Sequence, residues 1–251
     1  MKSLKYMGPE IEEYFSTHRT TWDGFYPSER SLIEAVWPVE PPRILDIGSA
    51  CGGLGLALQE RFGNLSSYTG IEFNTQAVQT AQRLNPSARF IEGDFLQVSD
   101  AELDPRGYDL VFSLSCVDWQ INTLELLNRA WEAVAPGGLL ILSLRLTLDA
   151  SCTDYSESFQ FINYQGLLQG EKAPYVVLNA GEVAATVKAL GARGLVAHGD
   201  WGPPSSTAVT PYSSLCFTVL ALAKSEERLS ATWELALPYE VVSTLRNCDD
   251  G

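Results

Sequence analysis

A glycine-rich turn is the segment of this chain best suited to binding a ligand. It runs from Gly48 to Gly55 as Gly-Ser-Ala-Cys-Gly-Gly-Leu-Gly and follows the strand-like run Arg43–Ile47. Glycines let a ligand approach the backbone, and a helix predicted over Leu54–Phe62 offers unpaired N–H groups at its start. Asp46, the only acid in that run, would repel a pyrophosphate but accept hydrogen bonds from an amino-bearing or cationic group. The turn therefore predicts a nucleotide-like ligand that carries such a group.

Two common nucleotide-binding turns do not fit this segment. A dinucleotide fingerprint needs the pattern G-x-G-x-x-G, and the second glycine counted from Gly48 falls on Ala50. A Walker-type phosphate loop needs a Gly-Lys-Ser/Thr sequence, and no lysine lies near the turn. Both patterns are therefore disfavoured.

The elements that must position this turn alternate regularly along the chain. Asn74 is placed to cap a helix that stops before Pro86, and a later helix is expected to end at Pro136-Gly-Gly. This alternation is typical of βαβ units and of a parallel sheet covered on both faces. The expected strands are Arg43–Ile47, Ser67–Ile71, Ala88–Ile91, Tyr108–Leu114, Gly138–Leu146, Gly194–His198 and Leu215–Ala223, with a further helix over Ala180–Leu190.

The segment around the turn resembles motif I of the class I S-adenosylmethionine-dependent methyltransferases, roughly D/E-x-G-x-G-x-G, with Ala50 in place of the middle glycine. The resemblance continues in order: Glu72 ends the second strand, Asp94 follows the third in Gly-Asp-Phe, and Ala135-Pro-Gly-Gly leads into the fifth. It implies an α/β fold, a three-layer Rossmann-like sandwich with a mostly parallel, seven-stranded sheet whose last strand is antiparallel.

The resemblance also implies S-adenosyl-L-methionine as cofactor and S-adenosyl-L-homocysteine as product. In that family the acid matching Glu72 holds the two ribose hydroxyls, and the acid matching Asp94 lies beside the adenine amino group, where Phe95 could stack on the ring. Arg19 is a candidate for the methionine carboxylate or for an acidic acceptor, and Tyr26 for a cofactor or acceptor contact. The implied cofactor contacts are Asp46, Gly48, Ser49, Ala50, Gly52, Glu72, Phe73, Asp94, Phe95 and Ser115.

Three other segments are candidates for the acceptor pocket: the N-terminal stretch 18–29, Trp119-Gln120 after the fourth strand, and the insertion 147–174. Aromatic side chains there could exclude water and pack on an apolar acceptor. His18 is the candidate general base, because an unperturbed imidazole titrates near neutrality, and an exposed histidine near a helix end is the alternative. The candidate substrate contacts are Trp22, Trp119, Gln120, Tyr155 and Phe159.

The amino-acid composition limits the classes of molecule that this protein is expected to bind. With 17 Lys+Arg against 31 Asp+Glu the net charge is −14, which disfavours nucleic acid and anionic membranes as partners. The longest apolar runs are shorter than the roughly 20 residues of a membrane span, and the N-terminus has no apolar core of a signal peptide. Five widely spaced cysteines without a CxxC pair indicate reduced thiols in a cytoplasmic protein. No metal site is expected.

The expected activity is transfer of a methyl group to an oxygen or nitrogen of a small molecule, such as a sugar or secondary metabolite. The fourth strand lacks the D/N/S-P-P-Y/F/W stretch of amino-methyltransferases that act on nucleic acids, since Asp118-Trp-Gln stands nearby instead. Two other hypotheses remain: a non-catalytic binding or scaffold protein of the same fold, and an NAD-dependent oxidoreductase.

One domain is expected over residues 1–251. Its parts would be an N-terminal helical cap (1–40), a cofactor-binding half (43–146), a lid-like insertion (147–179), the rest of the sheet (180–224) and a peripheral tail (225–251).

Overall fold

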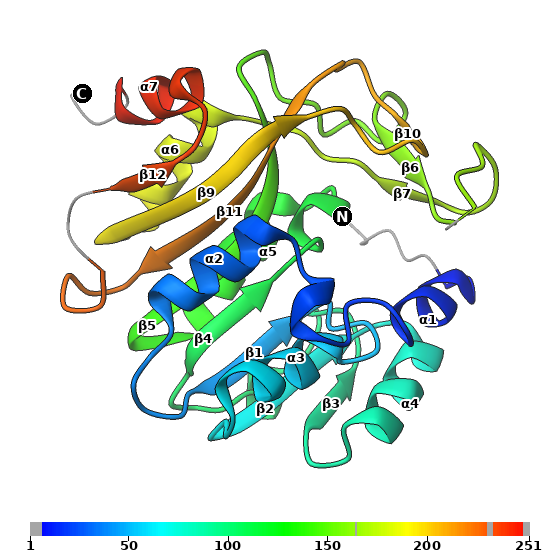
Figure 1. Ribbon diagram of the computed structural model, residues 1–251, viewed down its shortest axis with the longest axis vertical. Coiled ribbons are helices and arrows are strands. Elements are labelled where there is room, and N and C mark those ends of the chain that lie inside the picture. Colours follow the sequence, from blue (N-terminus) through cyan, green and yellow to red (C-terminus); the bar gives the residue numbers. More distant parts are fainter. Residues whose placement is uncertain (1–6, 164, 230–232, 248–251) are drawn as a thin grey trace.

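A mixed nine-stranded sheet forms the centre of the computed structural model, which describes residues 7–163, 165–229 and 233–247 (Figure 1). The strand order is β12-β9-β11-β5-β4-β1-β2-β3, and β8 pairs with β5 outside this order. Among the described strands of this nine-stranded sheet, only β11 runs antiparallel to both of its neighbours. The strands are β1 (Arg43–Ile47), β2 (Ser67–Glu72), β3 (Arg89–Glu92), β4 (Tyr108–Ser113), β5 (Val134–Thr147), β8 (Leu178–Asn179), β9 (Gly194–Gly202), β11 (Leu215–Ala223) and β12 (Glu234–Ala236).

Helices cover both faces of this sheet, which is why its strands are apolar on both sides. In β1, Ile44 packs with α2 and α3 in one apolar cluster, whereas Leu45 packs with α5, α6 and α7 in the other. Asn74 caps α4 as expected, since its side chain accepts hydrogen bonds from the backbone N–H groups of Gln76 and Ala77. The helices are α2 (Pro27–Val36), α3 (Gly53–Phe62), α4 (Thr75–Leu84), α5 (Thr123–Ala133), α6 (Ala180–Ala189) and α7 (Tyr239–Asn247).

Two segments far apart in the sequence meet beyond the carboxyl ends of the strands. One is the N-terminal segment with α1 (Glu10–Phe15) and η1 (Trp22–Gly24), and the other is a small antiparallel sheet in the order β10-β6-β7. The Glu171 carboxylate joins them, because it accepts hydrogen bonds from the backbone N–H groups of Met7 (2.9 Å) and Gly8 (2.8 Å). The small sheet comprises β6 (Phe159–Phe161), β7 (Lys172–Pro174) and β10 (Ala208–Val209), and two further 3-10 turns are η2 (Asp100–Glu102) and η3 (Val117–Trp119).

The expected strands are confirmed with shifts of a few residues at their ends, but three expectations need correction. The sheet has nine strands rather than seven, because β8 and β12 add to the seven expected. The fifth strand begins at Val134, so α5 ends at Ala133 and Pro136-Gly137-Gly138 lie inside the strand. Residues 234–247 are not peripheral: β12 extends the sheet beside β9, and Val241 and Leu245 of α7 are buried in the main core.

The turn after β1 has an unusual backbone. Gly48, Ala50 and Gly52 all have positive φ angles, of 75°, 44° and 74°. At Gly48 only glycine fits, because an added Cβ would lie 2.4 Å from the sulfur of Cys116. Ala50 adopts the left-handed region without the freedom of glycine, which costs roughly 1–2 kcal/mol.

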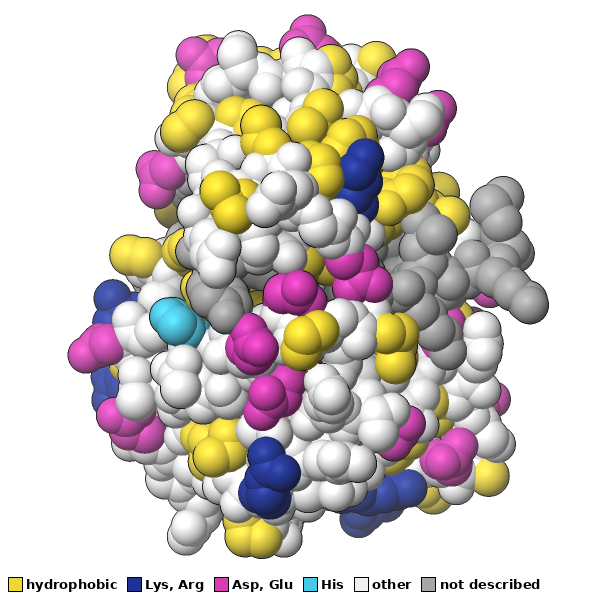
Figure 2. Space-filling model, turned by 90° about the vertical axis from the view of Figure 1, so that its right-hand side faces the viewer, with side chains coloured by type: hydrophobic (Ala, Val, Ile, Leu, Met, Phe, Trp, Pro, Cys, Tyr) yellow, Lys and Arg dark blue, Asp and Glu magenta, His cyan; other side chains and the backbone are white. Residues whose placement is uncertain are grey.

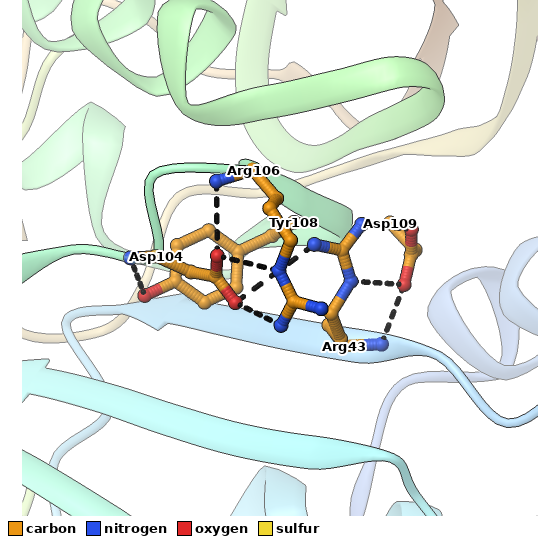
Figure 3. Close-up of polar contacts among 5 residues, drawn as sticks. All are labelled: Arg43, Asp104, Arg106, Tyr108 and Asp109. Atoms are coloured by element: carbon orange, nitrogen blue, oxygen red, sulfur yellow. Dashed lines mark hydrogen bonds and ion pairs between the residues drawn. The ribbon is translucent and has the colours of Figure 1, made fainter.

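A polar network ties the amino ends of β1 and β4 together, at the edge of the sheet opposite the turn (Figure 3). The Arg43 side chain donates to both oxygens of Asp109 (2.8 and 3.0 Å), and the Arg43 backbone N–H donates to the same carboxylate. Asp104 accepts from Arg106, while its own N–H donates to the Tyr108 hydroxyl. The network therefore holds the two central strands in register.

The face shown in Figure 2 carries Lys and Arg as separate side chains among more numerous Asp and Glu. That face thus offers no continuous basic surface to a polyanion. Within the described part of the chain, no helix is long and apolar enough to cross a membrane.

Substitution of Arg43 tests the network. We expect Arg43→Leu to lower the free energy of unfolding by about 1–3 kcal/mol, because a partly buried, bidentate pair to a charged group is lost. Arg61→Leu is the matched control, since its pair with Glu34 is exposed and should contribute less than about 1 kcal/mol. Urea unfolding measures both, and equal losses would contradict the assignment.

Substitution of Ala50 tests the strain in the turn. We expect Ala50→Gly to raise the free energy of unfolding by roughly 0.5–1 kcal/mol, since relief of the left-handed strain exceeds the added entropy of the unfolded chain. Ala185→Gly makes the same side-chain change at an exposed position inside α6 and should lower stability by about 1 kcal/mol. A loss of stability in Ala50→Gly would show that the methyl group contributes more by packing than it costs in strain.

Candidate functional site

A cavity lies at the carboxyl ends of β1, β2 and β4, where the topology brings the sequence-predicted acids together. Asp46 is the penultimate residue of β1, Glu72 ends β2 and Asp94 follows β3, and all three are buried and line this cavity. We call it the first cavity. Ten other residues that the sequence analysis named as site candidates also line it: Gly48, Ser49, Ala50, Phe73, Phe95, Ser115, Trp119, Gln120, His18 and Arg19.

Glu72 organises the backbone around this cavity. One carboxylate oxygen accepts from the N–H of Asn74 (2.8 Å) and the other from the N–H of Ala50 (3.1 Å). Burial raises the pKa of the Glu72 carboxyl, while these backbone N–H groups oppose the rise. Because each oxygen has a further lone pair, the carboxylate can accept more hydrogen bonds from a ligand.

Asp46 is a second acid of the cavity whose pKa is perturbed by burial. Its carboxylate accepts a hydrogen bond from the Tyr68 hydroxyl and is only 4% exposed. Burial raises its pKa from 3.8 to about 7, although Tyr68 and the nearby Arg19 act in the opposite direction. A cationic ligand would favour the ionised form.

Two buried polar atoms on the cavity wall lack a hydrogen-bond partner within the described residues. They are Oγ of Ser49 and Oε1 of Gln120. A buried polar group without a partner costs roughly 1–3 kcal/mol, so these atoms favour a polar ligand that would satisfy them. The glycines of the turn instead admit close protein neighbours, since an added Cβ at Gly52 would lie 2.7 Å from the Phe90 ring.

The N-terminal segment covers the first cavity. Its backbone at Arg19 packs against Gly53, where an added Cβ would lie 2.2 Å from the Arg19 carbonyl oxygen. The Arg19 side chain lies 4.4 Å from the centre of the Phe25 ring and pairs with the buried Glu29 through its Nη2 (2.9 and 3.0 Å). The structure thus gives Arg19 a carboxylate partner of its own, beside the cavity in which it was expected to meet the cofactor.

His18 is exposed at the edge of the same cavity and stacks on Tyr14 at 4.1 Å between ring centres. Its Nδ1 lies 2.8 Å from the Tyr14 carbonyl oxygen. A carbonyl oxygen only accepts, so Nδ1 carries the proton and Nε2 is the basic nitrogen of the neutral ring.

A second cavity of about 450 Å³ adjoins the first, whose volume is about 120 Å³ beneath the N-terminal segment. Ser115 and Trp119 line both. Tyr26 lines the second cavity and not the first. Buried on its wall are three residues that the sequence interpretation did not single out as a site: Asp118, Arg145 and Tyr175.

A sequence signal for this second group did exist. Arg145 is the only charged residue in the apolar run Gly138–Leu146, and a charge inside a buried strand needs a partner. That partner is Asp118, whose Oδ2 lies 3.3 Å from the Arg145 Nε. The guanidinium also lies 3.7 Å from the centre of the Tyr175 ring.

Four predicted site residues lie elsewhere. Trp22 is buried in the apolar core against Phe62 rather than on a cavity wall. Tyr155 and Phe159 lie at the small sheet, where Lys172 packs on the Phe159 ring, and neither lines either cavity. Gly52 lies behind the first cavity, facing Phe90. The aromatic content of these segments was visible in the sequence, but which way each ring points depends on packing.

Comparison with known proteins agrees with this architecture. Residues 45–140 match the family model of a methyltransferase domain. A trans-aconitate 2-methyltransferase of Rhodopseudomonas palustris is 29% identical over 120 residues, or 48% of this chain and 45% of that protein. One from Deinococcus radiodurans is 26% identical over 207 residues, 72% of this chain and 75% of its own length. The chain therefore spans less than half of the first of these relatives.

Solved structures share the fold at low identity. A Thermotoga maritima methyltransferase, described as a possible histamine N-methyltransferase, has a TM-score of 0.51 and 16% identity, covering 86% of this chain and 95% of its own. Phosphoethanolamine N-methyltransferase 2 of Haemonchus contortus has a TM-score of 0.57 and 14% identity, covering 80% and 53%. Residues 45–140 therefore match a methyltransferase domain, and the chain shares its fold with solved S-adenosylmethionine-dependent methyltransferases.

Proposed function

We propose that this protein transfers a methyl group from S-adenosylmethionine to an oxygen or nitrogen of a small molecule. The observation that carries the proposal is the pair of adjoining cavities. The first combines the glycine turn with three buried acids, and the second has polar and aromatic walls suited to a separate ligand. A group transfer between two ligands needs this arrangement, because the reacting atoms must meet at the boundary.

The residues of the first cavity fit the cofactor. The carboxylate of Glu72 would accept the ribose hydroxyls, Asp94 and Phe95 would face the adenine, and Asp46 would accept from the amino-acid end. When bound, the cofactor supplies a methyl group that its sulfonium already activates. The protein's own contribution is to bind, orient and exclude water, for which the N-terminal segment provides cover.

A small-molecule acceptor is supported by the relatives, which are named as trans-aconitate 2-methyltransferases. Ser115 and Trp119 form the shared wall where acceptor and cofactor would meet. His18 lines the first cavity and not the second, so it lies on the cofactor side of the site rather than on the acceptor side. The described cysteines are free thiols, in keeping with the cytoplasmic location that we propose.

Calorimetric titration with S-adenosylhomocysteine, alongside NAD, tests the proposal. We expect binding of the former alone and a more than tenfold weaker affinity in Glu72→Ala, because hydrogen bonds to a buried carboxylate contribute about 1.5–3 kcal/mol each. Glu92→Ala is the control. Glu92 is the residue of β3 that lies beside Glu72 of β2 in the strand register, but its side chain is exposed and lies outside the cavity. Tighter binding of NAD would contradict the proposal.

Affinity should also depend on pH through Asp46. Between about pH 4 and pH 7 the folded, ligand-free protein keeps Asp46 protonated, whereas the unfolded chain has released this proton, because the pKa is raised from 3.8 to about 7. The free energy of unfolding therefore falls as the pH rises through this range. A ligand whose amino group needs the carboxylate should bind roughly tenfold more weakly at pH 6 than at pH 8. Asp46→Asn should bind weakly with a flat profile over this range, and a flat profile in the unmodified protein would sink the assignment.

A further inference from the structure

The second cavity contains a buried carboxylate oxygen that no described residue satisfies. Asp118 is 4% exposed, and its Oδ1 has no hydrogen-bond partner within the described residues. Its other oxygen is held by Arg145, whose Nη1 also donates to the Asp118 backbone carbonyl (2.9 Å). That carbonyl accepts a second hydrogen bond from the N–H of Val176 (2.9 Å). The carboxylate is therefore rigidly placed on the cavity wall, with one oxygen left to accept a hydrogen bond.

The charges around this oxygen decide which ligand it suits. Arg145 is the one cation among the described residues that line the second cavity, and it is paired with Asp118. Glu29 lines the same cavity and is paired with Arg19, while Asp200 at the exposed edge adds a negative charge. The walls thus carry no uncompensated positive charge among these residues, and an anionic ligand would meet Asp118 and Asp200 without a free counter-ion.

Aromatic side chains form much of the remaining wall, beside the polar side chains of Ser143, Gln160 and Ser205. The buried ring of Tyr175 lies against the Arg145 guanidinium, and Trp119, Trp201 and Phe217 line the cavity around it. Aromatic walls with a few polar groups are typical of a site for a planar or apolar molecule that hydrogen bonds orient.

From this arrangement we infer that Asp118 binds the methyl acceptor, and that the acceptor is an uncharged small molecule which donates an O–H or N–H to Oδ1 and rests its apolar body on the aromatic walls. This inference rests on the proposed function, since the molecule in the second cavity is taken to be the acceptor. It separates the acceptor of this protein from polycarboxylates such as trans-aconitate, for which the described walls offer no free cation. Burial raises the pKa of the Asp118 carboxyl, although Arg145 acts against the rise, so the group is also a better proton acceptor than an exposed aspartate.

The test compares small probes that differ in charge and in the hydrogen-bond donor that they offer. Phenol and aniline each offer a donor on an uncharged ring, benzoate offers an anion, and trans-aconitate offers three carboxylates. Binding is measured by ligand-observed NMR titration of the full chain with S-adenosylhomocysteine saturating the first cavity, so that the probes compete only for the second. We expect phenol or aniline to bind more tightly than benzoate or trans-aconitate, and the stronger of the two identifies hydroxyl or amine as the preferred donor.

Asp118→Asn should reverse this preference. The substitution keeps the shape but leaves Arg145 without its counter-ion, so phenol should bind about tenfold more weakly and benzoate more tightly. Asp149→Asn makes the same change at an exposed acid that lines neither cavity and should alter neither affinity. Because an unpaired buried arginine destabilises the fold, the double variant Asp118→Asn with Arg145→Gln removes both charges. It should lose phenol affinity without gaining benzoate affinity.

Three results would overturn the inference: tighter binding of benzoate or trans-aconitate than of phenol and aniline, unchanged phenol affinity in the folded variants, or no binding of either uncharged probe. Binding of S-adenosylhomocysteine distinguishes failure of the proposed function from failure of this inference. If S-adenosylhomocysteine does not bind, the methyltransferase proposal falls, whereas phenol binding to the free protein still reports on Asp118.

Discussion

The geometry of the first cavity depends on one buried carboxylate, that of Glu72. It accepts hydrogen bonds from the backbone after β1 and from the backbone that leads into α4, so it joins two loops that the sheet brings side by side. The backbone N–H groups of Gly48 and Ser49 add to this connection by donating to the carbonyl of Ile71 (2.9 and 3.0 Å). Parallel pairing of β1 and β2 thus does more than build a sheet: it sets the loops at a distance where one carboxylate reaches both.

Most buried charged groups around the two cavities are paired with another group of the protein. Arg19 pairs with Glu29, Arg145 pairs with Asp118, and Tyr68 donates to Asp46, so most buried charges have a partner inside the protein. The atoms without a described partner are therefore informative, since a buried polar group is normally satisfied. Oγ of Ser49 and Oε1 of Gln120 belong to residues that line the first cavity, and Oδ1 of Asp118 belongs to a residue that lines the second. They mark the two places where ligand atoms would complete the hydrogen bonding.

The covering elements come from two parts of the chain that are far apart in the sequence. The N-terminal segment lies over the first cavity, and the small sheet from the insertion packs beside it through Ile11, Ile162 and Ala173. Glu171 links the two through backbone N–H groups, so both parts of the cover are joined to each other. A cover of this kind would exclude water from the first cavity.

Most of the sheet, the glycine turn and the three acids of the first cavity were predictable from the sequence, because they depend on local patterns. An apolar run, a glycine turn and an acid at a strand end are adjacent in the chain, and parallel strands bring their carboxyl ends together by topology alone. The second cavity was not predictable in this way. The pairing of Asp118 with Arg145, the stacking of Arg145 on Tyr175, the burial of Trp22 and the docking of α7 all join residues distant in sequence. Whether such a side chain faces a cavity or the core depends on which elements pack against it, and only the tertiary structure decides that.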